Sequence, residues 1–155
     1  MRQTQELQSE KAKKFQAHLK ANKITVFTVE QLKDEANSVV FRSRMEVKGQ
    51  ELPVMVVLDN SIYALIRVQI ARNAVTEENR AAIEALLWRY TQGYKPFKYY
   101  AAEDGTLCLD CCLIATDEQF DSALLQTMLQ VTLRHLQETY PAIMRCVWNE
   151  EAKGA

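Results

Sequence analysis

The middle of the chain alternates between apolar and polar side chains, a pattern typical of strands that bury one face. Residues 38–48 place apolar side chains at alternate positions, with Arg, Glu and Lys residues between them. Residues 62–70 alternate in the same way, whereas residues 52–58 are almost wholly apolar. Short turns separate the three runs, so the pattern predicts an antiparallel meander of three or four strands.

Three other segments show the apolar spacing of amphipathic helices, at residues 3–21, 76–92 and 117–140. The apolar stripe of the first is thin, so this helix needs a surface to pack on. The third has the widest apolar face. Pro141 is expected to break or bend the third helix, leaving a short apolar extension over residues 142–148.

Residues 24–35 fit two kinds of structure. The apolar residues at the start of this segment favour a strand, whereas Thr28 followed by Gln31 fits a capping box, which begins a helix. We favour a short strand that ends in a turn over residues 34–37, and the helix stays as the alternative.

Asp104-Gly105 lies between two extended runs, 97–102 and 106–115, and is the strongest short hairpin signal in the chain. The order of elements is one helix, three or four strands, a helix, two strands and a helix. This order predicts a single α+β domain over residues 1–155, with helices packed on an antiparallel sheet. Its expected parts are an N-terminal helix (1–22), a strand meander (24–71), a middle helix (76–92), a hairpin (97–115) and a C-terminal helix with its extension (117–148).

The charge balance narrows the classes of partner. Lys and Arg number 19 and Asp and Glu number 20, so the net charge is −1. Nucleic acids and anionic membranes need a broad positive surface, so we expect neither as a partner. The polar start MRQTQELQSEKAKKF has no apolar signal core, and no run of about 18 apolar residues follows. We therefore expect a cytoplasmic protein with free thiols.

Three of the four cysteines lie in the stretch TLCLDCCLIAT, residues 106–116. In a strand, alternate side chains point to opposite faces, so Cys108 and Cys112 share one face with Asp110 while Cys111 lies on the other. A zinc site needs a turn that brings two thiolates to one metal, and no second pair lies at zinc spacing. We therefore expect no metal and no cofactor, and interpret these cysteines chiefly as small apolar side chains.

The remaining charged and aromatic residues indicate chemistry only weakly. Residues 95–100 mix aromatic and basic side chains, as single-strand nucleic-acid platforms do, but a hairpin strand with aromatic faces is commoner. Arg42, Arg44 and Arg67 fit either a cationic strip across neighbouring strands or an ordinary solvated face. Neither histidine lies near a Ser or Cys in a recognisable catalytic motif, so no catalytic residue is assigned.

The apolar run at residues 52–58 is the strongest indication of function. If one alternate set of its side chains packs under the helices, Met55 and Val57 face the other way. Tyr63 and Leu65 of the next run can then lie beside them. Apolar surface of this kind often marks an interface, although a further strand or the first helix would also account for it by covering it. We expect these four residues to contact a protein partner.

Residues 75–148 carry a recognisable sequence of features. These are Val75-Thr76-Glu77-Glu78-Asn79-Arg80 before a helix, the hairpin around Asp104-Gly105, a strand with Leu107 and Leu109, and a long helix reaching Tyr140-Pro141-Ala142-Ile143-Met144. This pattern resembles the YbjN family of bacterial sensory-transduction regulators, and the upstream strands fit it too. The resemblance implies the type III secretion chaperone-like fold in a small cytoplasmic bacterial protein, often dimeric, with no established enzymatic activity. Chaperones that share this fold bind extended segments of partner proteins.

Together these features predict a non-enzymatic protein-interaction module, a regulator or chaperone-like binder that forms a homodimer. Its mechanism would be burial of the apolar face, with main-chain pairing to an extended segment of the partner. The alternative hypothesis is a thiol-based, redox-responsive regulator that uses Cys108 and Cys112, which requires accessible thiols of low pKa. Thiol titration with and without peroxide separates the two hypotheses.

Overall fold

The alternating runs fold into the strands of one sheet, and the segments with helical spacing pack on it. The computed structural model describes residues 6–149. The elements are α1 (Glu10–Ala21), β1 (Thr28–Gln31), β2 (Val39–Val47), β3 (Gln50–Leu58), β4 (Tyr63–Ala71), α2 (Arg80–Gly93), β5 (Phe97–Ala101), β6 (Leu107–Ile114) and α3 (Ser122–Val147). The predicted α+β fold is confirmed.

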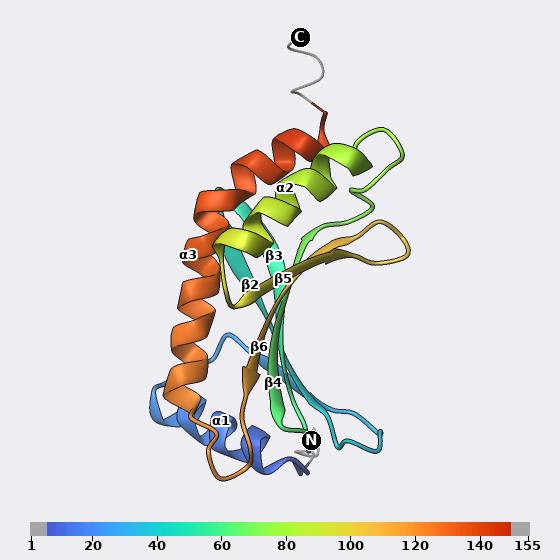
Figure 1. Cartoon of the computed structure of the whole chain (residues 1–155). Coiled ribbons are helices and arrows are strands. Elements are labelled where there is room, and N and C mark those ends of the chain that lie inside the picture. The colour runs from blue at the N-terminus through green and yellow to red at the C-terminus, as the bar shows by residue number, and fades with distance from the viewer. Residues whose placement is uncertain (1–5, 150–155) are drawn as a thin grey trace.

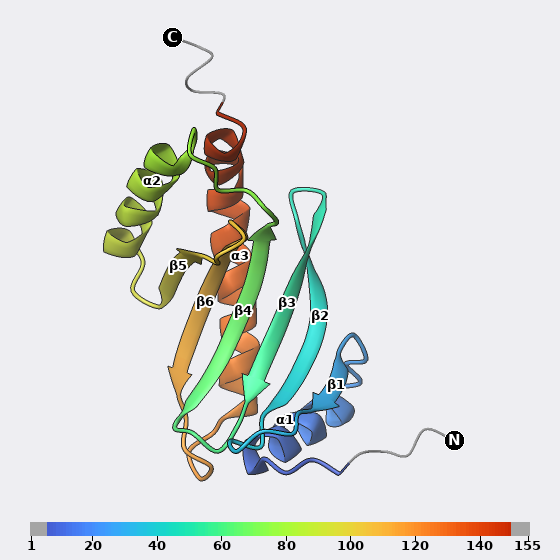
Figure 2. The same cartoon turned by 90° about the vertical axis from the view of Figure 1, so that its right-hand side faces the viewer.

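All neighbouring strands are antiparallel, and their order in the sheet is β1-β2-β3-β4-β6-β5. Strands β1 to β4 form the meander that the alternation predicts (Figure 2). The hairpin of β5 and β6 joins the meander through β6, which pairs with β4, so β5 is an edge strand. Gly105 turns this hairpin at φ +81°, where a Cβ would lie 2.8 Å from the carbonyl oxygen of Val75. Only glycine fits such a close approach.

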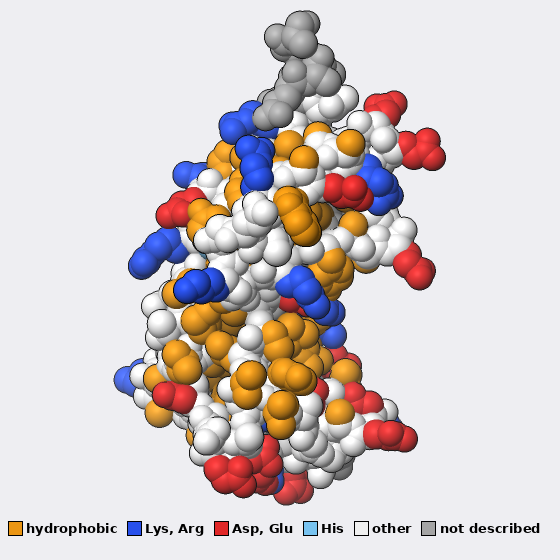
Figure 3. All heavy atoms as spheres, viewed as in Figure 1, with side chains coloured by type: hydrophobic (Ala, Val, Ile, Leu, Met, Phe, Trp, Pro, Cys, Tyr) orange, Lys and Arg blue, Asp and Glu red, His pale blue; other side chains and the backbone are white. Residues whose placement is uncertain are grey.

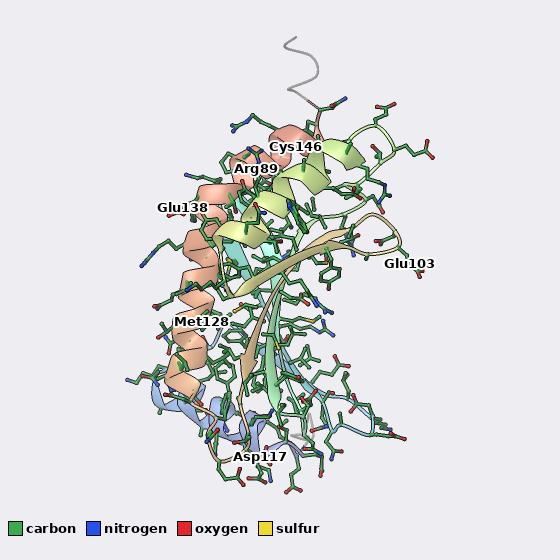
Figure 4. The ribbon with its side chains drawn as sticks, viewed as in Figure 1. Arg89, Glu103, Asp117, Met128, Glu138 and Cys146 are labelled. Atoms are coloured by element: carbon green, nitrogen blue, oxygen red, sulfur yellow. The ribbon has the colours of Figure 1, made fainter. Side chains whose placement is uncertain are left out.

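Helices α1 and α3 cover one face of the sheet, and in residues 6–149 no element covers the other (Figure 1). Leu136 and Ile143 of α3 are fully buried. Phe15 of α1 packs edge-on against Phe41 of β2, with ring centroids 4.9 Å apart. Side chains fill the space between α3 and the sheet (Figure 4), and Met128 is one of those packed against the core.

All three helices begin later than the sequence predicted, and for α1 and α3 the reason is that the residues that cap them lie further along. Ser9 caps α1 by accepting from the Ala12 N–H at 3.2 Å, so the helix expected from residue 3 starts at Glu10; residues 3–5 lie outside the described part. Asn79 precedes α2, and Asp121 caps α3 by accepting from two backbone N–H groups. The Thr116 hydroxyl accepts from the Gln119 N–H at 3.2 Å, but this hydrogen bond closes a turn before the helix.

Two further expectations are settled by the structure. Residues 28–31 form the short strand β1, so this segment contains a strand as favoured and its helical alternative is wrong, but residues 24–27, whose apolar side chains suggested the strand, precede it. Pro141 lies inside α3, which continues to Val147 instead of breaking. The helix bends in its last third (Figure 1), as expected where a proline removes one backbone hydrogen bond.

A buried lysine ties α1 to the end of the sheet. The Lys11 Nζ donates to the carbonyl oxygens of Ser61 at 2.6 Å, Tyr63 at 2.8 Å and Ala115 at 3.0 Å. Burial lowers the pKa of this lysine below its ordinary value. The three carbonyls belong to the β3–β4 turn, the start of β4 and the residue after β6, so this contact fixes the end of the sheet that carries Tyr63.

Candidate binding surface

The open face, meaning the sheet face opposite α1 and α3, is formed by the alternate residues of each strand that the helices leave uncovered. The strand register sets these side chains in rows that cross the sheet. One row contains Val40, Val57, Leu65 and Cys112, and the next contains Arg42, Met55, Arg67, Asp110 and Lys98. Apart from Glu30, which pairs with Val40 at the β1 end, the first row is uncharged, whereas the second is largely charged, so the face combines two kinds of surface.

The structure places all four predicted contact residues on the open face. Tyr63 is 50% exposed, and Met55, Val57 and Leu65 are half-buried. Tyr63 pairs with Ile114 of β6, which is 78% exposed. Together with Ile114, which the sequence prediction missed, they form the apolar patch: Met55, Val57, Tyr63, Leu65 and Ile114. Val40 lies in the same row as Val57 but is only 4% exposed. No strand or helix of residues 6–149 covers this patch, which removes the competing explanation for these residues.

The space-filling view shows the shape of this side of the molecule. The open face lies along the right-hand side of Figure 3, where the outline of the molecule is hollowed. Apolar side chains also gather in the lower half of this view, over β6 and the adjoining part of α3 (Figure 3). The apolar surface of the open face therefore continues around the edge of β6, where Ile114 and Leu124 are the most exposed apolar residues.

An ion pair occupies the centre of the open face. The Arg67 guanidinium donates through Nε to Asp110 Oδ1 at 2.8 Å and through Nη2 to Asp110 Oδ2 at 2.9 Å. The Asp110 side chain is only 6% exposed and that of Arg67 is 35% exposed. The guanidinium also lies over the Tyr100 ring, 5.4 Å from its centroid. This bidentate pair compensates the burial of a charge within the sheet.

A cavity of about 700 Å³ adjoins the ion pair, and all three arginines of the predicted cationic strip line it. We call it the arginine groove; its lining residues include Arg42, Arg44, Arg67, Pro53 and Met55. Arg42 lies 3.5 Å from Glu30, and Arg67 is held by Asp110. Among the described residues, Arg44 has no ion pair, so its charge is the one left for a ligand. The groove therefore combines a cationic wall with an apolar floor.

A second cavity, of about 460 Å³, lies on the other side of Arg67. Val57, Tyr63 and Leu65 line it together with Lys98 and Asp110. The two cavities make the open face uneven on either side of the central ion pair. Three of the four predicted contact residues therefore line this second cavity, and the fourth, Met55, lines the arginine groove.

The two candidate redox thiols share the open face but lie apart. Cys108 is buried against Tyr100, and Cys112 is exposed beside Leu65. Four residues of strand separate their Cα atoms by about 13 Å, and a disulfide needs about 7 Å or less. Burial raises the pKa of both thiols, which favours the unreactive protonated form. In the described part, no three His, Cys, Asp or Glu side chains cluster so as to hold a metal ion.

The aromatic and histidine residues of β5 and α3 belong to the packing. Phe97 and Tyr99 point to the helices and are buried, so on β5 the open face receives Lys98 and Tyr100. His135 is buried beside them, stacks on Phe97 with ring centroids 4.2 Å apart, and its Nε2 lies 2.5 Å from the Tyr99 hydroxyl. Burial lowers the pKa of His135 to about 4, so the ring is neutral near pH 7.

Comparison with known proteins adds no relative. A scan against protein-family models finds no family that matches this chain, and a search of curated proteins finds no similar sequence. The resemblance to the YbjN family stays a prediction from the sequence. Within residues 6–149, no helix combines the length and apolarity needed to cross a bilayer.

Proposed function

We propose that this chain is a non-enzymatic, YbjN-like protein-interaction module that acts in the cytoplasm as a regulator or chaperone-like binder. Its binding surface is the open face. The proposal rests on one observation. In residues 6–149 no layer covers one whole face of the six-stranded sheet, although one of the two central rows of side chains on that face is largely apolar. Apolar surface left in water is a cost that association with another protein removes.

The apolar patch has the properties of an interface centre. A tyrosine presents a large apolar ring and a polar hydroxyl, and such residues often dominate interface energies. Tyr63 is half exposed at one end of the patch, with Ile114 beside it and Leu65 on the same strand. Burial of apolar area contributes about 25 cal/mol per Å², so covering Tyr63 and Ile114 would stabilise a complex by a few kcal/mol before entropy is counted.

A second copy of the chain is the first partner that we propose for the patch. The patch carries no charge, so two copies related by a two-fold axis present matching apolar surfaces without like-charge repulsion. The charged row that contains Arg42, Arg67 and Lys98 adjoins this patch and shares Met55 with it, and its charged side chains stay available to another partner.

Light scattering over a concentration series tests this proposal. The monomer mass is 17.8 kDa, and we expect the wild type to reach twice that value. Leu65→Asp places a charge in the patch and should return the mass to that of the monomer, and Tyr63→Ala should weaken association by about 1 kcal/mol or more. Trp88→Asp is the matched control, because Trp88 is 67% exposed on α2, away from the open face.

Two results would contradict the proposal. One is a wild-type protein that stays monomeric throughout the series. The other is a dimer that Leu65→Asp and Trp88→Asp affect equally, with both variants folded by circular dichroism. The thiol-based alternative has less support, because the pKa of each candidate thiol is raised and the two lie too far apart to form a disulfide with each other.

A further inference from the structure

Half of strand β2 lies at an open edge of the sheet. Strand β1 pairs with β2 only from Val39 to Arg42, and beyond Arg42 no described strand pairs with this side of β2. In Figure 2 the upper half of β2 borders the sheet with no ribbon beside it. We propose that this edge binds an extended peptide segment of a partner protein as an added strand, and that the segment alternates acidic with apolar side chains. This inference rests on the proposed function and defines the partner's chemistry.

The main chain of this edge points outwards at Arg44 and Glu46. Pro53 lies opposite Arg44 in the register and has no N–H, so this pair exchanges no ladder hydrogen bonds on its β3 side. In an antiparallel pair such residues direct their main-chain groups to the other side. The Glu46 carbonyl confirms that direction, because it accepts from Gln137 Nε2 of α3 at 3.1 Å. Within the described residues no comparable contact reaches the main chain of Arg44, so it can pair with an added strand.

Cavities on both faces of the sheet meet at this edge. On the open face lies the arginine groove of about 700 Å³. On the helix-covered face lies an apolar pocket of about 300 Å³, lined by residues that include Phe15, Leu19, Phe27, Met45, Leu129 and Leu133. Val26, Ser43, Arg44 and Val54 line both cavities, so the two adjoin where β2 is unpaired.

This pair of cavities defines what an added strand must carry. Successive side chains of a strand point to opposite faces, so one enters the arginine groove and the next enters the apolar pocket. A carboxylate suits the groove, because Arg44 has no ion pair among the described residues and presents a guanidinium fork. An aliphatic side chain suits the pocket, whose lining is largely apolar. The partner segment therefore alternates Asp or Glu with residues such as Val or Leu.

Fluorescence anisotropy with synthetic peptides tests the inference. The probe is a short fluorescein-labelled peptide of alternating valine and aspartate. A peptide with lysine in place of aspartate tests the charge, and the valine–aspartate peptide N-methylated at alternate amides tests main-chain pairing. We expect only the unmodified valine–aspartate peptide to bind. Amide hydrogen exchange of the protein should show that the Arg44 N–H becomes protected when this peptide binds.

Charge reversal on the protein gives the matched comparison. Arg44→Glu should weaken binding of the valine–aspartate peptide roughly tenfold or more, since it replaces an attractive charge pair with a repulsive one. Arg89→Glu makes the same change in charge on α2, away from the edge, and should leave the affinity unchanged (Figure 4). Both side chains are exposed, so neither variant disturbs the core.

The outcomes separate this inference from the proposed function. The edge proposal is wrong if no peptide binds. It is also wrong if Arg44→Glu binds the valine–aspartate peptide as tightly as the wild type does and the N-methylated peptide binds as tightly as the unmodified one. A dimer that Leu65→Asp dissociates would then still support the open face as a binding surface. Conversely, a monomeric wild type whose Arg44 edge binds the valine–aspartate peptide supports the edge and overturns the proposed dimer patch.

Discussion

The two faces of the sheet are built from the same strands, yet they differ in what they bury. On the covered face, Val56, Ile66 and Leu109 are fully buried beneath helices. On the open face, their sequence neighbours Val57 and Leu65 are half-buried, and Asp110 is buried only because Arg67 pairs with it. The covered face therefore supplies the folding energy, and the open face is free to carry charges and exposed apolar groups that folding alone does not need.

The faces also differ in how they tolerate polar groups. Around the covered side, the titratable His135 is held neutral, with its pKa lowered to about 4 by burial. On the open face, an aspartate is instead kept beside an arginine in a bidentate ion pair. A dry, apolar environment excludes charge, whereas a partly hydrated face allows a paired one.

The largest expected effect on stability comes from truncating one leucine to alanine on each face and comparing the two losses. Leu109→Ala removes a fully buried side chain and should lower the free energy of unfolding by about 2–5 kcal/mol. Leu65→Ala removes a half-buried side chain next to solvent and should cost less than about 1.5 kcal/mol in the monomer. Urea unfolding of both variants, at a concentration where the protein is monomeric, gives the comparison. Equal losses would mean that the open face is as much a part of the core as the covered face.

A smaller effect is expected from pH. The pKa of His135 is about 4 in the folded protein and about 6.5 when unfolded, so the unfolded state binds the extra proton between these values. Stability is therefore full above pH 6.5 and falls as the pH drops towards 4, by about 3 kcal/mol, since each pKa unit corresponds to about 1.4 kcal/mol.

His135→Phe isolates this contribution from that of the carboxylates. The variant keeps an aromatic ring against Phe97 but cannot titrate, so its unfolding free energy should change less between pH 7 and pH 4 than that of the wild type. Urea unfolding at intermediate pH values measures both curves. Parallel curves would show that His135 does not carry the pH dependence.

The strands and the polarity of their faces could be predicted from sequence because side-chain alternation is a local property. The set Met55, Val57, Tyr63 and Leu65 follows from alternation and lies together on the open face. Ile114 was missed because its membership depends on which strands are neighbours, and it pairs with Tyr63 on β4, far away in the chain. The helix starts were misplaced for a different reason, since several residues could cap and local packing selected later ones.

The ion pair and the arginine groove could not be assembled from sequence alone. Asp110 lies between Cys108 and Cys112 on one face of an apolar strand, and a charge in such a place is a signal that a partner faces it. Only the register between β4 and β6 identifies that partner as Arg67. Likewise, the three arginines of the predicted strip meet in one cavity because the register sets Arg42 and Arg67 on either side of Met55, with Arg44 two residues further along β2.

The most direct measurement uses a thiol that the chain already carries on the open face. Cys112 is exposed next to Leu65 in the apolar patch, while Cys108, Cys111 and Cys146 are buried. Maleimide labelling of Cys112, followed by mass spectrometry, should be faster in dilute protein than at concentrations where the dimer forms. In Leu65→Asp the labelling rate should be the same at both concentrations. A labelling rate of wild-type Cys112 that does not change with protein concentration would contradict the open face as the surface that a second copy covers.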